Sequence, residues 1–479
     1  MNSLINAKYK QMKYITRITG SGVMILLLLA GLAGSAQNKG TKAFSLKEAQ
    51  DYAVQNAYAM RNATIDLTIA KKKIWEMTAI GLPQINGSVQ YQDMLDIPTT
   101  LLPDFITPAI IGVNEGLYGL TKIHPAPETQ FFPAKFGTQH NMSLGGTLSQ
   151  LIFSGEYIVG LQATKAFYQI STQTLTKTEQ ETRSTIAQVY YMVLVGEETR
   201  NILKDQTKAF EKVLYETDES LKNGFVEDIT VDQLKINLQN LKNAIISLER
   251  NDVNAKNLLK FQMGIDIAED IQLKDSLPAL LKQTVAELIQ TNDFKLANHI
   301  DFKLMETNEK MLLLNYRREQ SAYLPKLSAF YTYQDKAMRN KFDIFQKGDW
   351  YPTSIIGVNL DIPIFSSGMR HFKVQQAQLA LDKIRISREQ VGQGLKMGAE
   401  TARSGFNNAV DNYLSLKENK ELSANIYKKT MIKFREGLST STELTQIQNQ
   451  HLTNLTSYYK AIYELLLAKA NYDKAMNNY

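Results

Sequence analysis

The side chains best suited to catalysis or metal binding are few and scattered in this chain. The sequence has no cysteine, which excludes disulfides, thiolate metal sites and cysteine nucleophiles. No G-x-S-x-G, Walker or H-E-x-x-H pattern occurs. The five histidines are too dispersed for a metal cluster: His124, His140, His299, His371 and His451. We therefore expect no catalytic residue, no cofactor and no bound metal.

Carboxylates gather after two glycines that interrupt long helical patterns. Glu443 follows Gly437, and three acidic residues follow Gly224: Glu227, Asp228 and Asp232. Carboxylates that share one ring attract cations and repel anions. At the start of a helix they also stabilise the macrodipole. The spacing leaves both roles open, a cation-binding ring or a solvated helix start.

The first 36 residues have the composition of an export signal. A basic region with Lys8, Lys10, Lys13 and Arg17 precedes a short apolar run over 23–34 and small residues up to Ala36. The run is shorter than the ~20 residues of a spanning helix. We predict a signal peptide over 1–36. Removing its four basic groups reduces the net charge from +6 to 6 − 4 = +2, so no nucleic-acid partner is expected.

The rest of the chain repeats one unit. "LPQINGSVQYQD" at 82–93 resembles "LPKLSAFYTYQD" at 324–335, and "SLGGTLSQLIFSGEY" at 143–157 resembles part of "SIIGVNLDIPIFSSGMR" at 354–370. Each copy reads helix, strand, loop, strand, long helix, turn, helix. We assign the first repeat to 37–270 and the second to 271–479.

Alternating patterns place the strands at about 84–93, 142–153, 326–335 and 354–365. Ser45 and Glu48 form a capping box that starts the first helix, which runs to about Ile80 with a break near 56–58. The last strand has about 11 residues, the length a tilted strand needs to cross a bilayer.

Proline-free segments predict the long helices, because helix interiors do not tolerate proline. Helical hairpins are expected at about 156–263 and 368–477, with Gly196 marking a break in the first. In the last helix an apolar stripe steps by about 3.5 residues, as in coiled coils: Leu444, Ile447, His451, Leu455, Tyr458, Ile462 and Leu465. His451 is expected to pack in this stripe rather than to bind a ligand.

Four membrane strands in one chain cannot close a barrel, because open edges in lipid leave backbone groups unpaired. The edges must pair with other copies of the chain. Two copies would give 8 strands with a filled interior, and three would give 12 with an open lumen. The strand pattern does not choose between them.

In these features the chain resembles the TolC-like outer-membrane efflux family, over essentially all of the mature sequence. The resemblance rests on the Leu-Pro strand entries, the strand exits "LSQLIFSG" and "LDIPIFSSG", and two helix-turn-helix segments, "LKNGFVEDITVDQLKINLQNLKNA" and "FREGLSTSTELTQIQNQHLTN". It implies an α+β membrane protein. The expected assembly is a homotrimer with a 12-stranded transmembrane β-barrel continued by a long periplasmic α-helical barrel.

The resemblance also implies a role. Family members are outer-membrane exit ducts of tripartite efflux or type I secretion systems, extend into the periplasm, and are not enzymes. The implied partners are outer-membrane lipid, a periplasmic adaptor (membrane fusion protein) and an inner-membrane transporter. The transported substrate stays open, because specificity lies mainly in the transporter.

Site residues follow from the family pattern. Gly224 and Gly437 would lie at the periplasmic tip, where an acidic residue six positions beyond the glycine lines the pore constriction. Glu443 matches this position, whereas Gln446 departs from a second acidic position. In the first repeat Thr230 stands at that register, and Glu227, Asp228 and Asp232 are the nearby candidates. Phe434 stands where the family often has a gate tyrosine.

The junctions between strands and helices are marked by Pro83, Pro325, Pro363, Gly155 and Gly368. Ser-Ser-Gly at 366–368 is expected to turn the backbone from the last strand into the helix. On that strand, Ile356, Val358, Leu360, Ile362 and Ile364 would face lipid, and Asn359 and Asp361 the lumen. Aromatic residues near these ends would form the girdles of a barrel.

Two other classes compete with the duct. A periplasmic coiled-coil adaptor or structural protein is the main alternative, but adaptors have one helical hairpin and this chain has two. An outer-membrane barrel enzyme would need a nucleophile and a base that the sequence does not offer. The loop at 94–141, rich in proline, is expected to face outward, either over the mouth of the duct or as a plain surface loop.

Overall fold

The computed structural model describes residues 42–103, 131–286, 293–343 and 348–478, together with Leu117 and Gln346. The predicted signal peptide and the middle of the 94–141 loop lie outside the described residues. The chain divides into two compact units. The helical unit takes the described residues of 1–62, 178–294 and 397–479, and the sheet unit those of 63–177 and 295–396. Each unit contains segments of both predicted repeats, so the repeats are not the compact units.

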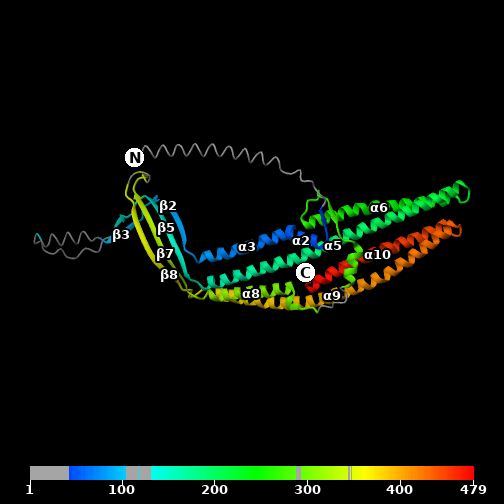
Figure 1. The fold of residues 1–479 in the computed structure, drawn as a ribbon. Coiled ribbons are helices and arrows are strands. Elements are labelled where there is room, and N and C mark those ends of the chain that lie inside the picture. Colours follow the sequence, from blue (N-terminus) through cyan, green and yellow to red (C-terminus); the bar gives the residue numbers. More distant parts are fainter. Residues whose placement is uncertain are drawn as a thin grey trace, which may run out of the picture. The chain divides into compact units, whose positions relative to one another are not determined.

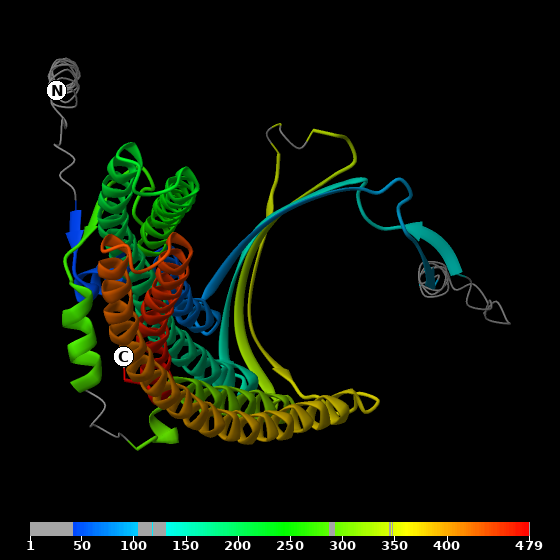
Figure 2. The ribbon, with the colours of Figure 1, turned by 90° about the vertical axis from the view of Figure 1, so that its right-hand side faces the viewer.

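The sheet unit contains a four-stranded antiparallel sheet with the order β2-β5-β7-β8. Its strands are β2 (Gln84–Asp93), β5 (His140–Phe153), β7 (Lys326–Arg339) and β8 (Tyr351–Asp361). The sheet is strongly curved (Figure 2). The central pair β5–β7 joins the first repeat to the second, with Thr147 opposite Thr332 and their hydroxyls 3.0 Å apart.

The strand ends differ from the sequence prediction in the second repeat. β7 continues to Arg339 rather than ending at 335, and β8 begins at Tyr351 rather than at 354. The prediction of a strand to 365 was wrong, because β8 ends at Asp361. Asp361 pairs with Lys326, the first residue of β7, so later residues have no strand to pair with. Ile362 and Ile364, predicted on the lipid face of this strand, therefore lie outside it.

Two small sheets were not expected from the sequence. In the sheet unit, β3 (Thr99–Pro103) pairs antiparallel with β4 (Phe131–Lys135) within the 94–141 loop. In the helical unit, β1 (Lys42–Phe44) pairs in parallel with β6 (Ile271–Leu273). Strands of three to five residues give a weak sequence signal, because alternation needs a longer run to be detected.

The helices include four long elements, which form two hairpins: α5 (Gly155–Lys222) with α6 (Asp228–Met263), and α9 (Met369–Arg435) with α10 (Ser441–Met476) (Figure 1). The shorter helices are α2 (Leu46–Asn56), α3 (Tyr58–Ile80), α7 (Leu277–Ala286), the 3-10 turn η2 (Leu296–Asn298) and α8 (Ile300–Ser321). The capping box of Ser45 and Glu48 is confirmed, and Ala57 separates α2 from α3.

The predicted break at Gly196 was wrong, because α5 runs through it without interruption for 68 residues. A Cβ atom at Gly196 would lie 2.7 Å from Oδ1 of Asp252 on α6. Arg200 pairs with the same carboxylate, with 2.6 Å between its guanidinium nitrogen and Oδ2. Glycine thus makes room for a buried charge rather than ending the helix.

The helical unit has its core between the two hairpins. The core cluster is made of Phe210 and Val213 from α5, Leu234 and Leu241 from α6, Tyr427 from α9 and Leu444 from α10. The apolar stripe predicted along α10 is confirmed, since its members from Leu444 to Leu465 are buried or partly buried.

Candidate functional site

The two hairpins of the helical unit close with the same backbone geometry. Gly224 and Gly437 both have left-handed φ angles, +75° and +70°. In each turn the glycine N–H donates to the carbonyl three residues earlier, and the following N–H donates to the carbonyl five residues earlier. This is the Schellman motif, which satisfies the last carbonyls of a helix and needs a residue without steric restriction at positive φ.

The helices that leave the two turns are capped differently. Thr440 caps α10, and its hydroxyl accepts a hydrogen bond from the Glu443 N–H at 3.2 Å. Glu227 holds the same position before α6 but makes no side-chain cap bond. The Glu443 carboxylate accepts a 2.7 Å hydrogen bond from the Ser439 hydroxyl, so within one chain it belongs to the helix start.

The other acidic candidates are exposed at the start of α6. Asp228 accepts a hydrogen bond from the Ile229 N–H at 2.8 Å, and Asp232 lies 3.2 Å from the ammonium group of Lys235. Gln446 is exposed one turn beyond Glu443. In a single chain these side chains form no closed binding site. Their exposure leaves them available to a ring built from several copies.

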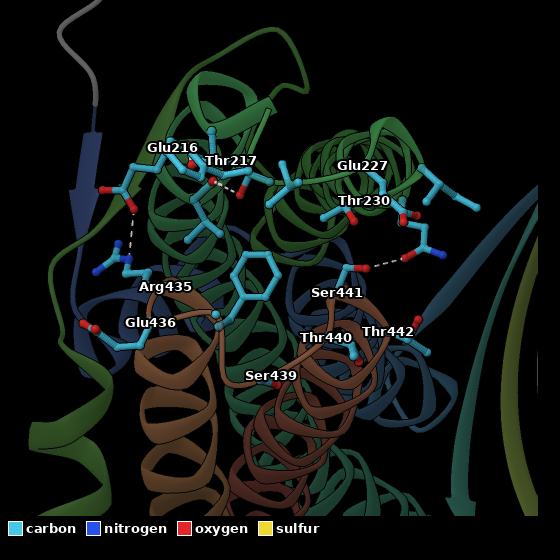
Figure 3. Close-up of a pocket in the computed structure, with 18 residues that line it drawn as sticks. Glu216, Thr217, Glu227, Thr230, Arg435, Glu436, Ser439, Thr440, Ser441 and Thr442 are labelled. Carbon is cyan, nitrogen blue, oxygen red and sulfur yellow. Dashed lines mark hydrogen bonds and ion pairs between the residues drawn. The ribbon is translucent and has the colours of Figure 1, made fainter. Parts of the chain in front are cut away.

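A cavity of about 900 Å³ lies between the two turns and is lined by both of them (Figure 3). Two contacts join the hairpins across it. Arg435 on α9 pairs with Glu216 on α5 at 2.9 Å, and the Ser441 hydroxyl donates to the Gln233 side chain at 2.8 Å. Phe434 lines the cavity and packs against the core cluster.

The joining contacts were missed from the sequence. Glu216 and Gln233 stand in the first repeat, and their partners Arg435 and Ser441 stand in the second. No local pattern relates residues so far apart. A third such contact lies one turn further along the same helices, where the Asn237 side chain donates to the Thr445 hydroxyl at 2.7 Å.

Deeper in the second hairpin, His451 is buried, as the sequence analysis expected. Its Nδ1 lies 3.1 Å from the Ser423 hydroxyl, and its ring stacks on Tyr427 with 5.3 Å between ring centres. Burial lowers the pKa of His451, and the nearby Lys420 ammonium lowers it further. Burial also raises the pKa of Tyr427 to about 12. The pair is therefore neutral at neutral pH.

The described residues contain no group of three histidine or carboxylate side chains placed to hold a metal ion. Among the described helices, none is both long and apolar enough to cross a membrane.

Comparison with known proteins gives two results. Residues 295–478 match the model of the family described as outer membrane efflux protein. This C-terminal segment is similar to outer membrane efflux proteins. No curated protein matches the sequence.

Solved structures share the fold of this chain at low sequence identity. The CmeC outer membrane channel of Campylobacter jejuni is 16% identical, with a TM-score of 0.66 over 90% of this chain and 85% of that one. The MtrE outer membrane channel of Neisseria gonorrhoeae, solved in its open state, is 15% identical, with a TM-score of 0.65 over 90% and 88%. The outer membrane protein VceC of Vibrio cholerae is 11% identical, with a TM-score of 0.64 over 90% and 95%.

In the sheet unit, the two strand-to-helix junctions are built differently. At the first, only Ser154 separates β5 from α5, which begins at Gly155. A Cβ atom at Gly155 would lie 2.8 Å from Leu324 Cδ1 and 3.0 Å from Ser321 Cβ. Tyr157 then donates its hydroxyl to the Thr78 carbonyl at 3.2 Å. This junction is closely packed against the ends of α3 and α8.

At the second junction, residues 362–368 link β8 to α9. Here Ser367 and Gly368 have positive φ angles of 49° and 80°, so Gly368 turns the backbone as predicted. Pro363 lies in this linker rather than in the strand. Its carbonyl accepts a 3.0 Å hydrogen bond from the Arg370 guanidinium. The other two prolines, Pro83 and Pro325, stand directly before β2 and β7.

Proposed function

We propose that this protein is the outer-membrane exit duct of a tripartite efflux or type I secretion system. In this proposal three copies form a passive channel from the periplasm to the outside, without catalysis. A periplasmic adaptor and an inner-membrane transporter would deliver the substrate to it.

The observation that carries the proposal is the two-sided character of the four-stranded sheet. One row of directly opposed residues crosses all four strands, and each side chain in it is large, apolar or aromatic, and exposed: Ile85, Leu148, Tyr331 and Ile356. On the opposite face, a row made of Ser88, Gly145, Gln334 and Thr353 is small or polar. Strands with one lipid face and one wet face have this alternation.

The strand lengths and edges support membrane insertion with other copies. β2 has 10 residues and β8 has 11, within the range that a tilted strand needs to span a bilayer. In the part of the chain that the structure describes, β2 and β8 each pair with one strand only. An unpaired edge in lipid is costly, so β8 of one copy would pair with β2 of the next. Three four-stranded sheets give 3 × 4 = 12 strands, enough for an open lumen.

The helical unit supplies the periplasmic end in this proposal. Its paired turns at Gly224 and Gly437 would form the tip that meets the adaptor. Three Glu443 carboxylates would share one ring around the pore entrance, with Gln446 adding uncharged polar groups. Glu227, Asp228 and Asp232 would increase the negative potential nearby, which favours cations. The contacts between Arg435 and Glu216, and the packing of Phe434, would hold the entrance closed.

The experiment that tests the duct is purification of the full chain in detergent, followed by reconstitution into a planar bilayer. We expect trimers by light scattering and stepwise ion conductance. Because a closed entrance reduces conductance, the Arg435→Gln variant should be measured alongside and should conduct more. A monomer that stays in solution without detergent and gives no conductance would overturn the proposal.

The pore ring has its own test. Glu443→Gln removes the charge but keeps an acceptor for the Ser439 hydroxyl. We expect a lower cation-to-anion permeability ratio, measured from reversal potentials in asymmetric KCl. Glu418→Gln, an exposed carboxylate on α9 outside the turns, is the matched control and should leave the ratio unchanged. Equal ratios for both variants would remove Glu443 from the ring without affecting the duct itself.

A further inference from the structure

Of the two strand-to-helix junctions, the linker between β8 and α9 has the more exposed apolar side chains. Ile364 is 91% exposed and Phe365 is 83% exposed, whereas Phe153 at the equivalent place in the first junction is 39% exposed. In Figure 2 the linker is the yellow segment at the end of α9. Large apolar side chains that are this exposed in neighbouring positions indicate a surface that something else covers.

The linker has a defined conformation. Arg370 donates to the Pro363 carbonyl at 3.0 Å, and the Met369 N–H donates to the Ser366 carbonyl at 2.9 Å. The Arg370 guanidinium also lies over the Tyr323 ring, 5.8 Å from its centre. The backbone is therefore held at both ends of the linker, while Ile364 and Phe365 stay outside the packing. The linker also directly continues β8, whose Ile356 belongs to the apolar row of the sheet.

The start of α9 is basic where a helix start favours acidic groups. Arg370 and Lys373 stand in the first residues of α9, whose first turn has no acidic residue. By contrast α5 has Glu156 in its first turn. Cations near a helix N-terminus oppose the macrodipole and destabilise the helix. Lys373 is exposed, and no carboxylate among the described residues pairs with it. These charges are better explained by an external anion than by the stability of α9.

We infer that the second junction is a membrane anchor that binds a phospholipid surface with anionic headgroups. Ile364 and Phe365 enter the acyl-chain boundary, and Lys373 with Arg370 contacts the phosphate groups beside it. Apolar side chains beside basic ones are the pattern of interfacial anchors, and each basic group near an anionic surface adds to the attraction. At the first junction the equivalent side chains Ile152 and Phe153 are less exposed, at 55% and 39%, and the acidic Glu156 stands in the first turn of α5. The anchor is therefore placed at the second junction of each chain. The inference rests on the proposed function, because it requires the sheet to lie in a bilayer.

A single tryptophan tests the position of the linker. The two native tryptophans are replaced (Trp75→Phe, Trp350→Phe), and Phe365→Trp is compared with Phe153→Trp in the reconstituted full chain. The vesicles contain phosphatidylethanolamine and phosphatidylglycerol brominated near the headgroup end of the acyl chains. We expect at least twofold quenching at 365 and clearly weaker quenching at 153. Blue-shifted emission without quenching would show that a second copy covers the linker, and red-shifted emission without quenching that water does. Either result would overturn the anchor.

The headgroup contact is tested separately with Lys373→Gln, and with Lys383→Gln as a control further along the same helix. We expect Lys373→Gln to weaken the affinity of the detergent-solubilised trimer for phosphatidylglycerol several-fold, while Lys383→Gln leaves it unchanged. Equal effects of the two variants would contradict a specific contact. Trimer mass and conductance are measured on the same samples. A trimeric, conducting protein without quenching at 365 would reject the anchor alone, whereas a protein that neither trimerises nor conducts would reject the duct and the anchor together.

Discussion

The two helical hairpins turn in the same way but pack differently inside. Phe210 and Leu238 lie equally far before and after Gly224, and Ser423 and His451 lie at the same separations from Gly437. The first pair belongs to or packs against the apolar core cluster. The second pair is joined by a 3.1 Å hydrogen bond. At this distance from the turns, the duplicated backbone thus carries an apolar pair in one hairpin and a polar pair in the other.

The difference predicts which changes affect the stability of each hairpin. An apolar pair responds to volume changes and hardly to pH, because neither side chain titrates. A buried histidine makes the packing depend on proton concentration. The two junctions of the sheet unit show a similar contrast, since Gly155 is required by close neighbours and Gly368 by backbone conformation.

Replacing the glycines at the strand-to-helix junctions has the largest expected effect on stability and distinguishes the two junctions. Gly155→Ala should lower the free energy of unfolding by about 2 kcal/mol, because the added methyl group overpacks against Ser321 and Leu324. Gly368→Ala should cost about 1 kcal/mol, mainly through the positive φ angle, because the only close neighbour of its Cβ would be the Phe372 ring, with Cε2 at 3.2 Å. Chemical unfolding in detergent measures both. Asparagine tests the reason, since Gly368→Asn should cost less than Gly368→Ala, whereas Gly155→Asn should cost more than Gly155→Ala. The same order at both sites would contradict the contrast.

The glycines of the two hairpin turns should instead have the same effect on stability when they are replaced. Gly224→Ala and Gly437→Ala should each cost about 1 kcal/mol, because a Cβ atom at either position has open space around it and only the φ angle opposes it. The same unfolding experiment provides the values. A difference larger than the cost itself would mean that one turn is held by contacts that the other lacks.

The N-cap residues that follow those glycines, at the start of α6 and of α10, should contribute differently to stability. Thr440→Ala removes the hydrogen bond to the Glu443 N–H and should cost about 1 kcal/mol. Glu227→Ala removes a side chain that makes no cap bond, so only a few tenths of a kcal/mol from the macrodipole are expected. Comparable losses would indicate that Glu227 makes a stabilising contact in the assembled protein.

The smallest expected effect depends on pH. Burial holds the pKa of His451 below the unfolded value of 6.5, so the unfolded chain takes up a proton first as pH falls. The stability of the protein should therefore decrease below about pH 6.5. His451→Leu, which copies Leu238 of the first hairpin, should reduce this decrease by less than about 1 kcal/mol at pH 5.5. Some pH dependence should persist, because burial lowers the pKa of His299 as well. Identical profiles of stability against pH for the wild-type protein and the His451→Leu variant would contradict the assignment of this effect to His451.

Much of the fold was predictable because its signals are local. The capping box of Ser45 and Glu48, the entry prolines before β2 and β7, and the stripe of α10 each lie within a few residues of one another. Gly224 and Gly437 were recognisable because a helix that ends in a left-handed residue favours glycine. The ends of β8 and the continuity of α5 were not predictable, because they depend on Lys326 and Asp252, which are distant in sequence.

The repeated order of helices and strands, the positions of the turns and the alternation of the strands can all be predicted from the amino-acid sequence. These follow from periodicity, capping and backbone preference, which act over one or two turns. The three-dimensional fold is needed to see that one apolar row crosses four strands, that Arg435 meets Glu216, and that the linker after β8 is exposed. Each of these depends on which distant segments become neighbours, and that is set by packing and register rather than by any local pattern.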